Sequence, residues 1–301
     1  MRNLFTLVLS LILFFACKNE QNEDKNENLP GSYSVVDDLG DTLTFDSPPQ
    51  KIITLAPNLT EILFAVGAGD RLIADTKYCN FPEAAKKLPK AGDLLTINYE
   101  LVASLKPDLI LMTIEGNTKD VYDRLKESGN NVFISNPRDY NGIKKTVKDI
   151  AAITGNPGIA DSLFTEWDGR LEKIKSDTPD PDGLQVMFMV SANPIMLAGK
   201  NTFVNEYLKM LGLRNIADEV ELNYPIFSRE RIFEVDPDYI FYPGMEKNVR
   251  ENVLNLYPEW NDLTSIKKGN FFTLDPDLFY RPGPRFIDAL DTLKTKVFRS
   301  R

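Results

Sequence analysis

The sequence predicts an α/β protein with two lobes, each a mainly parallel sheet flanked by helices, joined by one long helix. Three observations predict this fold. Short apolar runs alternate with amphipathic segments in both halves of the chain. A segment with one apolar face, long enough for about five helical turns, separates the two halves. A short helix followed by Pro-Asp and an apolar run is predicted once in each half.

The first half of the chain alternates predicted strands and helices. Buried strands are predicted for the short apolar runs at residues 51–56, 71–76, 108–113 and 131–135. Helices are predicted at residues 58–69, 98–105 and 119–129. Asn58 and Glu61 have the spacing of a capping box, and Gly67 is a natural residue for the end of the first helix. This order predicts an α/β lobe with a mainly parallel sheet.

Two consecutive helices are predicted in the middle of the chain. The first is marked by apolar residues at helical spacing, namely Ile143, Val147, Ile150 and Ile153. The second begins at Asn156-Pro157, because proline suits the first position of a helix. Its apolar residues recur every four positions as far as about Lys175, namely Ile159, Leu163, Trp167 and Leu171. We predict that this second helix joins the lobes.

The second half of the chain resumes the alternation of strands and helices. Strands are predicted at residues 184–190, 238–243 and 271–275. Helices are predicted at residues 202–212, 229–235 and 285–298. The pattern therefore predicts a second α/β lobe.

One phrase occurs in both halves of the sequence. "LVASLKPDLILMT" at residues 101–113 corresponds to "RIFEVDPDYIFYP" at residues 231–243. Glu100 and Glu230 each lie seven residues before the proline of their copy. Chance recurrence is the alternative, because Pro-Asp turns are common. The matching polar cap, glutamate and offset favour a repeat that relates two similar lobes.

The composition excludes several classes of function. The formal net charge of −9 leaves no basic surface for neutralising phosphates, so nucleic acid is not expected as a partner. Histidine is absent, which removes the Ser-His-Asp and Cys-His nucleophile systems and the commonest zinc ligand. The sequence has no phosphate-binding glycine loop and no acidic spacing typical of a calcium or magnesium site. We therefore expect a protein that is not an enzyme and has no metal site or cofactor of its own.

The N-terminus resembles a bacterial lipoprotein signal. Arg2 precedes an apolar run at residues 4–16 that is too short to span a bilayer as a helix. We predict that the following Cys17 is the lipidated N-terminus of the mature chain, the alternative being a secretory signal with a chance cysteine. Residues 18–33 are polar and rich in Asn and Glu, which predicts a flexible tether rather than a metal-binding segment. Cys79 then has no disulfide partner and is interpreted as a small packed residue.

Candidate ligand-binding residues lie where the predicted strands end. In open parallel sheets, ligands bind beyond the carboxyl ends of the strands. Aromatic side chains together with one or two arginines suit a flat or anionic organic ligand. Half-buried packing is the alternative for any single tyrosine. The candidates are Pro57, Asn58, Tyr78, Thr113, Asn193, Met196, Tyr224, Phe279, Tyr280 and Arg281.

Several motifs together carry a resemblance to a known family. They are "KIITLAPNLTEILFAVGAGDRLIADTKYCNFPEAAKKLPKAG", "SRERIFEVDPDYIFYP" and "RPGPRFIDAL". From about residue 34 to the end, the chain resembles the periplasmic binding proteins of cobalamin and ferric-siderophore ABC importers, the helical-backbone class of solute receptors. "YCNFPEA" and "RPGPR" are most similar to the cobalamin branch. The resemblance implies two lobes joined by one rigid helix, with the ligand in a cleft between them.

The resemblance also implies roles for particular residues. In the family, one glutamate on each lobe docks on the permease dimer, and these positions fall on Glu100 and Glu230. Tyr78, Tyr224 and Arg281 match positions that contact the ligand in the cobalamin receptor. Leu94, Thr113 and Met196 stand where that receptor has large aromatic residues, which leaves a siderophore or another corrinoid open as the ligand.

We therefore expect a monomeric, lipid-anchored binding protein on the periplasmic or cell-surface side of a membrane. Its partners would be a small-molecule metal chelate and an ABC permease dimer with its ATPase subunits. A haem receptor with a tyrosine such as Tyr78 on the iron, a two-lobed transferase and a purely structural lipoprotein remain alternatives. The expected units are the signal at 1–17, the tether at 18–33, the N-terminal lobe at 34–140, a helical connector at 141–176 and the C-terminal lobe at 177–301.

Overall fold

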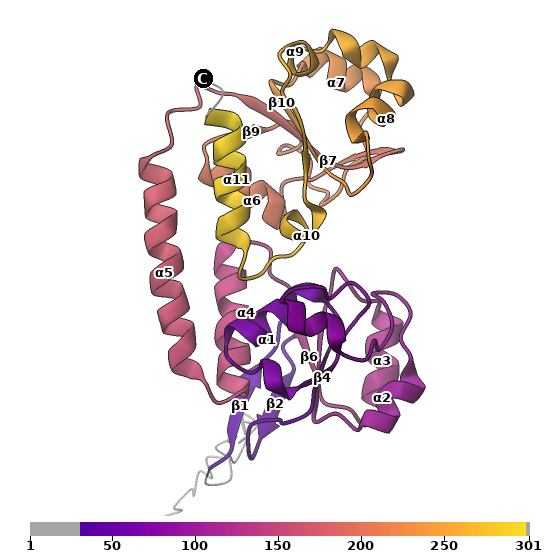
Figure 1. The fold of residues 1–301 in the computed structure, drawn as a ribbon, viewed down its shortest axis with the longest axis vertical. Coiled ribbons are helices and arrows are strands. Elements are labelled where there is room, and N and C mark those ends of the chain that lie inside the picture. The colour runs from indigo at the N-terminus through magenta and orange to yellow at the C-terminus, as the bar shows by residue number, and fades with distance from the viewer. Residues whose placement is uncertain (1–30, 299–301) are drawn as a thin grey trace, which may run out of the picture.

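The computed structural model describes residues 31–298, which form two α/β lobes and a helical connector (Figure 1). The lobes lie at opposite ends of the long axis of the molecule, and the long helix α5 (Pro157–Ser176) runs along one side of it. The predicted fold class is therefore confirmed. The predicted signal, Cys17 and the tether as far as residue 30 lie outside the described residues.

The described chain begins with a hairpin that the sequence analysis did not predict. Strands β1 (Tyr33–Val36) and β2 (Thr42–Phe45) pair in antiparallel orientation. Tyr33 is therefore part of a strand, although the predicted tether included it. Its hydroxyl donates to the carbonyl oxygen of Ile153 at 2.6 Å, which attaches the hairpin to the connector.

The N-terminal lobe is built on a four-stranded sheet in which every pairing is parallel. The strand order is β4-β3-β5-β6. The strands are β3 (Ile52–Thr54), β4 (Leu72–Ala74), β5 (Leu109–Thr113) and β6 (Val132–Ser135). The helices of this lobe are α1 (Pro57–Ala65), α2 (Tyr99–Leu105) and α3 (Lys119–Glu127). Every residue of β3, β5 and β6 is buried, as expected for parallel strands covered on both faces.

The predicted capping box at the start of α1 is wrong. The N-cap residue is Ala56, and no side chain caps this end of the helix. Asn58 lies within the helix, and its Nδ2 atom donates to the carbonyl oxygen of Pro282 in the C-terminal lobe at 3.3 Å. Glu61 is buried and forms ion pairs with the C-terminal lobe. The two polar residues have capping spacing, but tertiary contacts use their side chains instead.

The two helices predicted in the middle of the chain are α4 (Tyr140–Ile153) and α5. Pro157 occupies the first turn of α5, also as predicted. One continuous cluster of buried apolar side chains extends from the N-terminal sheet through both connector helices into the C-terminal lobe. Within it, the rings of Tyr140 and Phe286 stack with their centroids 5.5 Å apart. The lobes therefore share a hydrophobic core, which opposes free movement about the connector.

The C-terminal lobe has a mixed sheet in the order β11-β10-β7-β8, with β9 beside β7. Only the β7–β8 pair is antiparallel. The strands are β7 (Gln185–Ala192), β8 (Ile195–Leu197), β9 (Arg214–Asn215), β10 (Tyr239–Pro243) and β11 (Phe271–Leu274). The helices are α6 (Phe203–Met210), α7 (Arg229–Val235), α8 (Val249–Leu256), α9 (Thr264–Lys267), α10 (Pro276–Phe279) and α11 (Phe286–Phe298). The sequence analysis did not predict β8, β9, α8, α9 or α10.

The repeated phrase has the same backbone geometry in both lobes. Helices α2 and α7 each begin at a polar cap, where Asn98 and Ser228 accept a backbone N–H. Each helix ends at a residue in the left-handed region, with φ of 48° at Lys106 and 46° at Asp236. Both ends directly precede the Pro-Asp pair, where proline prevents continuation of the helix. The repeat in the sequence is therefore a repeat in structure.

The structural repeat extends beyond the phrase itself. The carboxylates of Asp108 and Asp238 accept the backbone N–H of Lys51 and Gln185, at 2.8 and 2.9 Å, where the neighbouring parallel strand begins. Farther along the chain, the side-chain amide of Asn131 donates to the carbonyl of Asp108 at 3.2 Å. The corresponding bond from Asn270 to Asp238 is 3.0 Å. The two lobes thus share a scaffold of three equivalent strands.

Candidate binding site between the lobes

A buried carboxylate on α1 links the N-terminal lobe to the C-terminal lobe. The Glu61 side chain is 1% exposed. It accepts from Arg281 Nη1 at 3.0 Å and from Arg285 Nη2 at 2.6 Å. Withdrawing charges from water costs several kcal/mol per ion unless they are paired and hydrogen-bonded. Separating the two lobes at this point would leave these charges unpaired, so the ion pairs favour contact between the lobes.

The structure assigns Arg281 to this link. Besides Glu61, its Nη atoms donate to Asn80 Oδ1 at 2.8 Å and to the carbonyl oxygen of Tyr78 at 3.0 Å. It also pairs with Asp277, and its side chain is only 7% exposed. A predicted ligand contact is thus, in this structure, a buried residue whose donors are directed at protein acceptors. Neither Glu61 nor Arg285 was among the predicted site residues, because the capping-box spacing supplied an ordinary explanation for Glu61.

The predicted ligand contact at Phe279 is wrong. This side chain is fully buried in the core of the C-terminal lobe. Its ring centroid lies 6.1 Å from that of Phe188 and 5.8 Å from that of Tyr207. Its neighbour Tyr280 remains 38% exposed. Adjacent residues at the end of α10 point to opposite sides, which the sequence of the loop does not reveal.

A second link between the lobes involves Glu115. The Tyr224 hydroxyl donates to Glu115 Oε2 at 3.2 Å, and Arg138 pairs with the other carboxylate oxygen. Burial of the hydroxyl raises the pKa of Tyr224, and the negative charge of Glu115 raises it further. Glu115 was not predicted, although it follows the end of β5 by two residues and the rule about strand ends applies to it.

Partly exposed aromatic side chains from both lobes accompany these links. Tyr78 and Phe81 of the N-terminal lobe are each 46% exposed, and Tyr224 of the C-terminal lobe is 37% exposed. The Arg285 guanidinium lies 4.5 Å from the centre of the Phe81 ring. Burial raises the pKa of Tyr280, and the nearby Tyr242 and Tyr224 contribute to the same shift. Aromatic surface is therefore concentrated where the lobes meet.

The other predicted residues are spread over several places in the two lobes. Thr113 is 8% exposed, and its hydroxyl oxygen accepts the N–H of Gly116 at 3.0 Å. The carbonyl of Leu94 accepts from Asn117 Nδ2, also at 3.0 Å, so both residues adjoin the loop that carries Glu115. The remaining three occupy other positions: Pro57 begins α1, and Asn193 is exposed in the β7–β8 turn. Met196 in β8 lies opposite Ile226 in an antiparallel bridge, whose hydrogen bonds run from Leu197 N–H to the carbonyl of Pro225 and from Phe227 N–H to the carbonyl of Ile195.

Cys79 is a buried free thiol, as predicted for a small packed residue. Its sulfur lies 3.1 Å from the Thr60 hydroxyl and 3.2 Å from the Thr76 hydroxyl. Burial raises the pKa of this thiol, so the reactive thiolate is disfavoured. The residue belongs to the packing of the N-terminal lobe.

The two glutamates of the repeat occupy equivalent positions. Glu100 and Glu230 are each the second residue of a short helix, and both are exposed. Hydrogen bonds from its own backbone N–H and from Ser228 lower the pKa of Glu230. Each lobe therefore presents one carboxylate to solvent at the N-terminus of a capped helix.

The described residues contain neither a candidate membrane-spanning helix nor a candidate metal-binding group of side chains. No helix within residues 31–298 is long and apolar enough to cross a membrane. In the same part of the chain, no three Cys, Asp or Glu side chains are grouped so that they could hold a metal ion.

Comparison with known proteins establishes the family. Residues 52–278 match the family model described as periplasmic binding protein. The chain belongs to the periplasmic binding protein family. A vitamin B12-binding protein of Photorhabdus laumondii is 31% identical, over 81% of this chain and 86% of that protein. An uncharacterized ABC transporter substrate-binding lipoprotein of Bacillus subtilis is 29% identical, over 97% of this chain and 95% of that protein.

Solved structures of family members have the same fold. The periplasmic vitamin B12-binding protein of Vibrio cholerae superposes with a TM-score of 0.73 at 26% identity, over 83% of this chain and 97% of that one. A periplasmic haem-binding protein of Pseudomonas aeruginosa gives a TM-score of 0.77 at 24% identity, over 84% and 94% of the two chains. The two-lobed architecture is therefore that of the family.

Proposed function

We propose that this protein is the substrate-binding component of an ABC importer, which captures a corrinoid between its lobes and delivers it to the permease. The observation that carries the proposal is the concentration of partly exposed aromatic side chains from both lobes at the lobe boundary. Such side chains provide flat apolar surface for a macrocycle. Vitamin B12-binding relatives from several bacteria support the same ligand class.

The charge balance at the lobe boundary favours a corrinoid over haem. Haem carries two carboxylates, which free arginines would be expected to bind in pairs of hydrogen bonds. Here Arg138 is paired with Glu115, while Arg281 and Arg285 share Glu61. The cationic groups that link the lobes are thus already neutralised. A ligand with an uncharged periphery, such as an amide-bearing corrinoid or a neutral ferric hydroxamate, suits this arrangement better.

The proposal includes a lipid anchor and a permease. We propose that Cys17 is lipidated and that the polar segment after it tethers the lobes to the outer face of a membrane, since a lipid anchor holds a protein at the surface without spanning it. A relative named as a lipoprotein supports this anchor. We further propose that Glu100 and Glu230 dock on the two subunits of the permease, because the repeat presents them equivalently.

Calorimetric titration of the purified soluble chain tests the ligand class. We expect cyanocobalamin to bind with a micromolar or tighter constant, which corresponds to about −8 kcal/mol. Haemin and one ferric hydroxamate, measured under the same conditions, serve as competitors. The corrinoid assignment would be overturned if haemin bound tightly and cyanocobalamin gave no heat. The family assignment would remain intact.

A further inference from the structure

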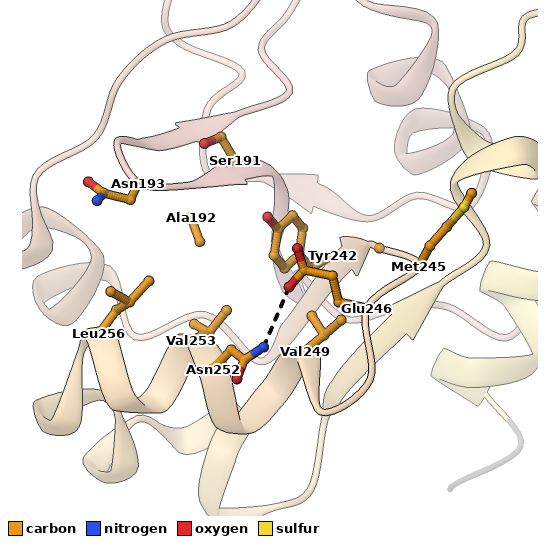
Figure 2. A pocket seen from close by; sticks show the side chains of 11 residues that line it. Ser191, Ala192, Asn193, Tyr242, Met245, Glu246, Val249, Asn252, Val253 and Leu256 are labelled. Carbon is orange, nitrogen blue, oxygen red and sulfur yellow. Dashed lines mark hydrogen bonds between the residues drawn. The ribbon is translucent and has the colours of Figure 1, made fainter. Parts of the chain in front are cut away.

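A cavity of about 350 Å³ lies within the C-terminal lobe at the carboxyl ends of β7 and β10 (Figure 2). Helix α8 forms its floor with the apolar side chains of Val249, Val253 and Leu256. Ser191, Ala192 and Asn193 from the end of β7 and the following turn form another wall. The cavity is too small for a whole macrocycle, and its size suits one substituent of a larger ligand.

Glu246 is the one charged side chain in the lining of this cavity, and the other polar side chains there are those of Ser191, Asn193, Tyr242 and Asn252. Figure 2 shows Glu246 and Asn252 pointing toward each other, and Asn252 Nδ2 donates to Glu246 Oε2 at 3.5 Å. No lysine or arginine within residues 31–298 forms an ion pair with Glu246. The cavity thus differs from the lobe boundary, where Glu61 and Glu115 are neutralised by arginines. An unpaired carboxylate accepts hydrogen bonds and repels other anions.

The strand β10 connects the cavity with the loop that carries Tyr280. Tyr242 near the end of β10 lines the cavity, and so does Gly244, whose backbone N–H donates to the carbonyl oxygen of Leu274 at 3.1 Å. Leu274 ends β11, and Tyr280 follows it by six residues. Tyr280 is one of the exposed aromatic residues of the proposed binding site. A substituent of a ligand bound against Tyr280 is therefore near the entrance of the cavity.

We infer that the cavity is a subsite for an uncharged or cationic hydrogen-bond-donating arm of the ligand, an amide or an ammonium group, and that Glu246 excludes carboxylate arms. The floor of α8 would contact the methylene groups of the arm, while Glu246 accepts its N–H groups. This inference rests on the proposed function, because it places a ligand between the lobes. It adds a specificity-determining residue that acts by charge.

Binding of matched corrinoids tests the inference. Cyanocobalamin carries propionamide arms, and hydrolysis of one amide gives monocarboxylate isomers that differ only in that group. Glu246 is exposed at the edge of the cavity, so water weakens its repulsion of another anion. We therefore expect at least one isomer to bind the native protein about fivefold more weakly than cyanocobalamin. In E246Q the penalty for that isomer should fall to about twofold or less, since the glutamine removes the charge and keeps the shape.

Two further variants define the outcome. Glu251→Gln changes a carboxylate on α8 that does not line the cavity, and it should leave the discrimination unchanged. Leu256→Trp fills the rim of the cavity at a residue that is 47% exposed, and it should weaken cyanocobalamin binding without lowering the melting temperature. The subsite would be overturned, and the proposed function would stand, if the native protein bound the amide and carboxylate forms with equal affinity. The same conclusion would follow if the discrimination persisted in E246Q. Absence of binding by every corrinoid would overturn both.

Discussion

The two lobes share a scaffold but differ where they face each other. In both, a capped short helix, a left-handed residue before Pro-Asp and an aspartate bound to the neighbouring strand recur with nearly equal geometry. At the boundary, however, the N-terminal lobe contributes the buried carboxylate of Glu61 and the C-terminal lobe contributes Arg281 and Arg285. Identical faces would place like charges against each other. The repeat therefore preserves the scaffold, while the facing surfaces have become complementary.

The largest expected effect comes from breaking this complementarity. Glu61→Ala leaves Arg281 and Arg285 without their shared anion in a buried site. Removing one partner from such a site costs about 3 to 5 kcal/mol of the free energy of unfolding, which urea denaturation would measure. Glu83→Ala removes a carboxylate from the exposed pair with Lys86 and should leave that free energy unchanged. A loss for Glu61→Ala no larger than that of the control would show that the link does not stabilise the lobes.

Two glycines test how closely the loops of each lobe approach a neighbouring backbone. A Cβ atom on Gly92 would lie 2.1 Å from the carbonyl oxygen of Thr96, and its φ is +128°. A Cβ atom on Gly199 of the C-terminal lobe would lie 2.2 Å from the carbonyl oxygen of Leu222. We expect Gly92→Ala to lower the free energy of unfolding by about 3 kcal/mol and Gly199→Ala by about 2 kcal/mol, because only the first also strains φ.

The control for both glycine variants lies in the connector. Gly169 is inside α5, and a Cβ atom there would meet nothing within 4 Å. Gly169→Ala should therefore raise the free energy of unfolding by about 0.8 kcal/mol, the difference in helix propensity. Losses of equal size at Gly92 and Gly199 would show that the backbone clash alone determines the cost.

Asp75 is another buried carboxylate of the N-terminal lobe, and it should make the stability of the protein depend on pH. Burial raises the pKa of Asp75 to about 6, although Lys90 lies 2.6 Å away and opposes the shift. The folded protein then binds more protons than the unfolded chain between about pH 4 and pH 6. Stability should therefore fall as pH rises through this window, by about 2 kcal/mol, and level off above it.

Asp75→Asn removes this titration. Urea unfolding of the variant at several pH values should show a smaller decrease in stability between pH 4 and pH 6 than the native protein shows. Parallel pH profiles for the two proteins would indicate that the Asp75 carboxyl titrates normally and that Lys90 fully compensates its burial.

The smallest change to the structure is expected from substituting Glu100 and Glu230, which occupy equivalent positions in the repeat and should affect function. Glu100→Lys and Glu230→Lys should each weaken binding to the permease about tenfold and leave ligand affinity unchanged, because both side chains are exposed. Glu127→Lys, an exposed charge reversal at the end of α3, is the matched control. Pull-down with the detergent-solubilised permease measures the effect. A loss confined to one of the two variants would show that the lobes dock differently, and a loss of ligand affinity would place these residues in the binding site.

Much of the fold was predictable because its signals are local. The apolar runs of β3, β5, β7 and β10 and the periodic face of α5 were predicted within a few residues. The missed elements β8 and β9 are short, and they exist because they pair with β7. The hairpin β1–β2 was also missed, although alternate residues of β2 are buried as its sequence pattern implies.

The candidate site was predictable only in outline. Strand ends indicated the region that contains Thr113 and Tyr224, and motif spacing indicated Glu100 and Glu230. The rule about strand ends did not separate Phe279, which is core, from its exposed neighbour Tyr280. It also did not identify Glu246, which lies in a loop without a recognisable motif.

The sequence by itself determined the alternation of the main strands and helices, the repeat and the absence of histidine chemistry, because each depends on residues near one another in the chain or on composition. Only the tertiary structure decided what Glu61 and Arg281 do. They lie 220 residues apart, and their pairing depends on how two lobes are held by a shared core. Long-range charge pairing leaves no periodic signal in the chain, so it becomes visible only when the lobes are brought together.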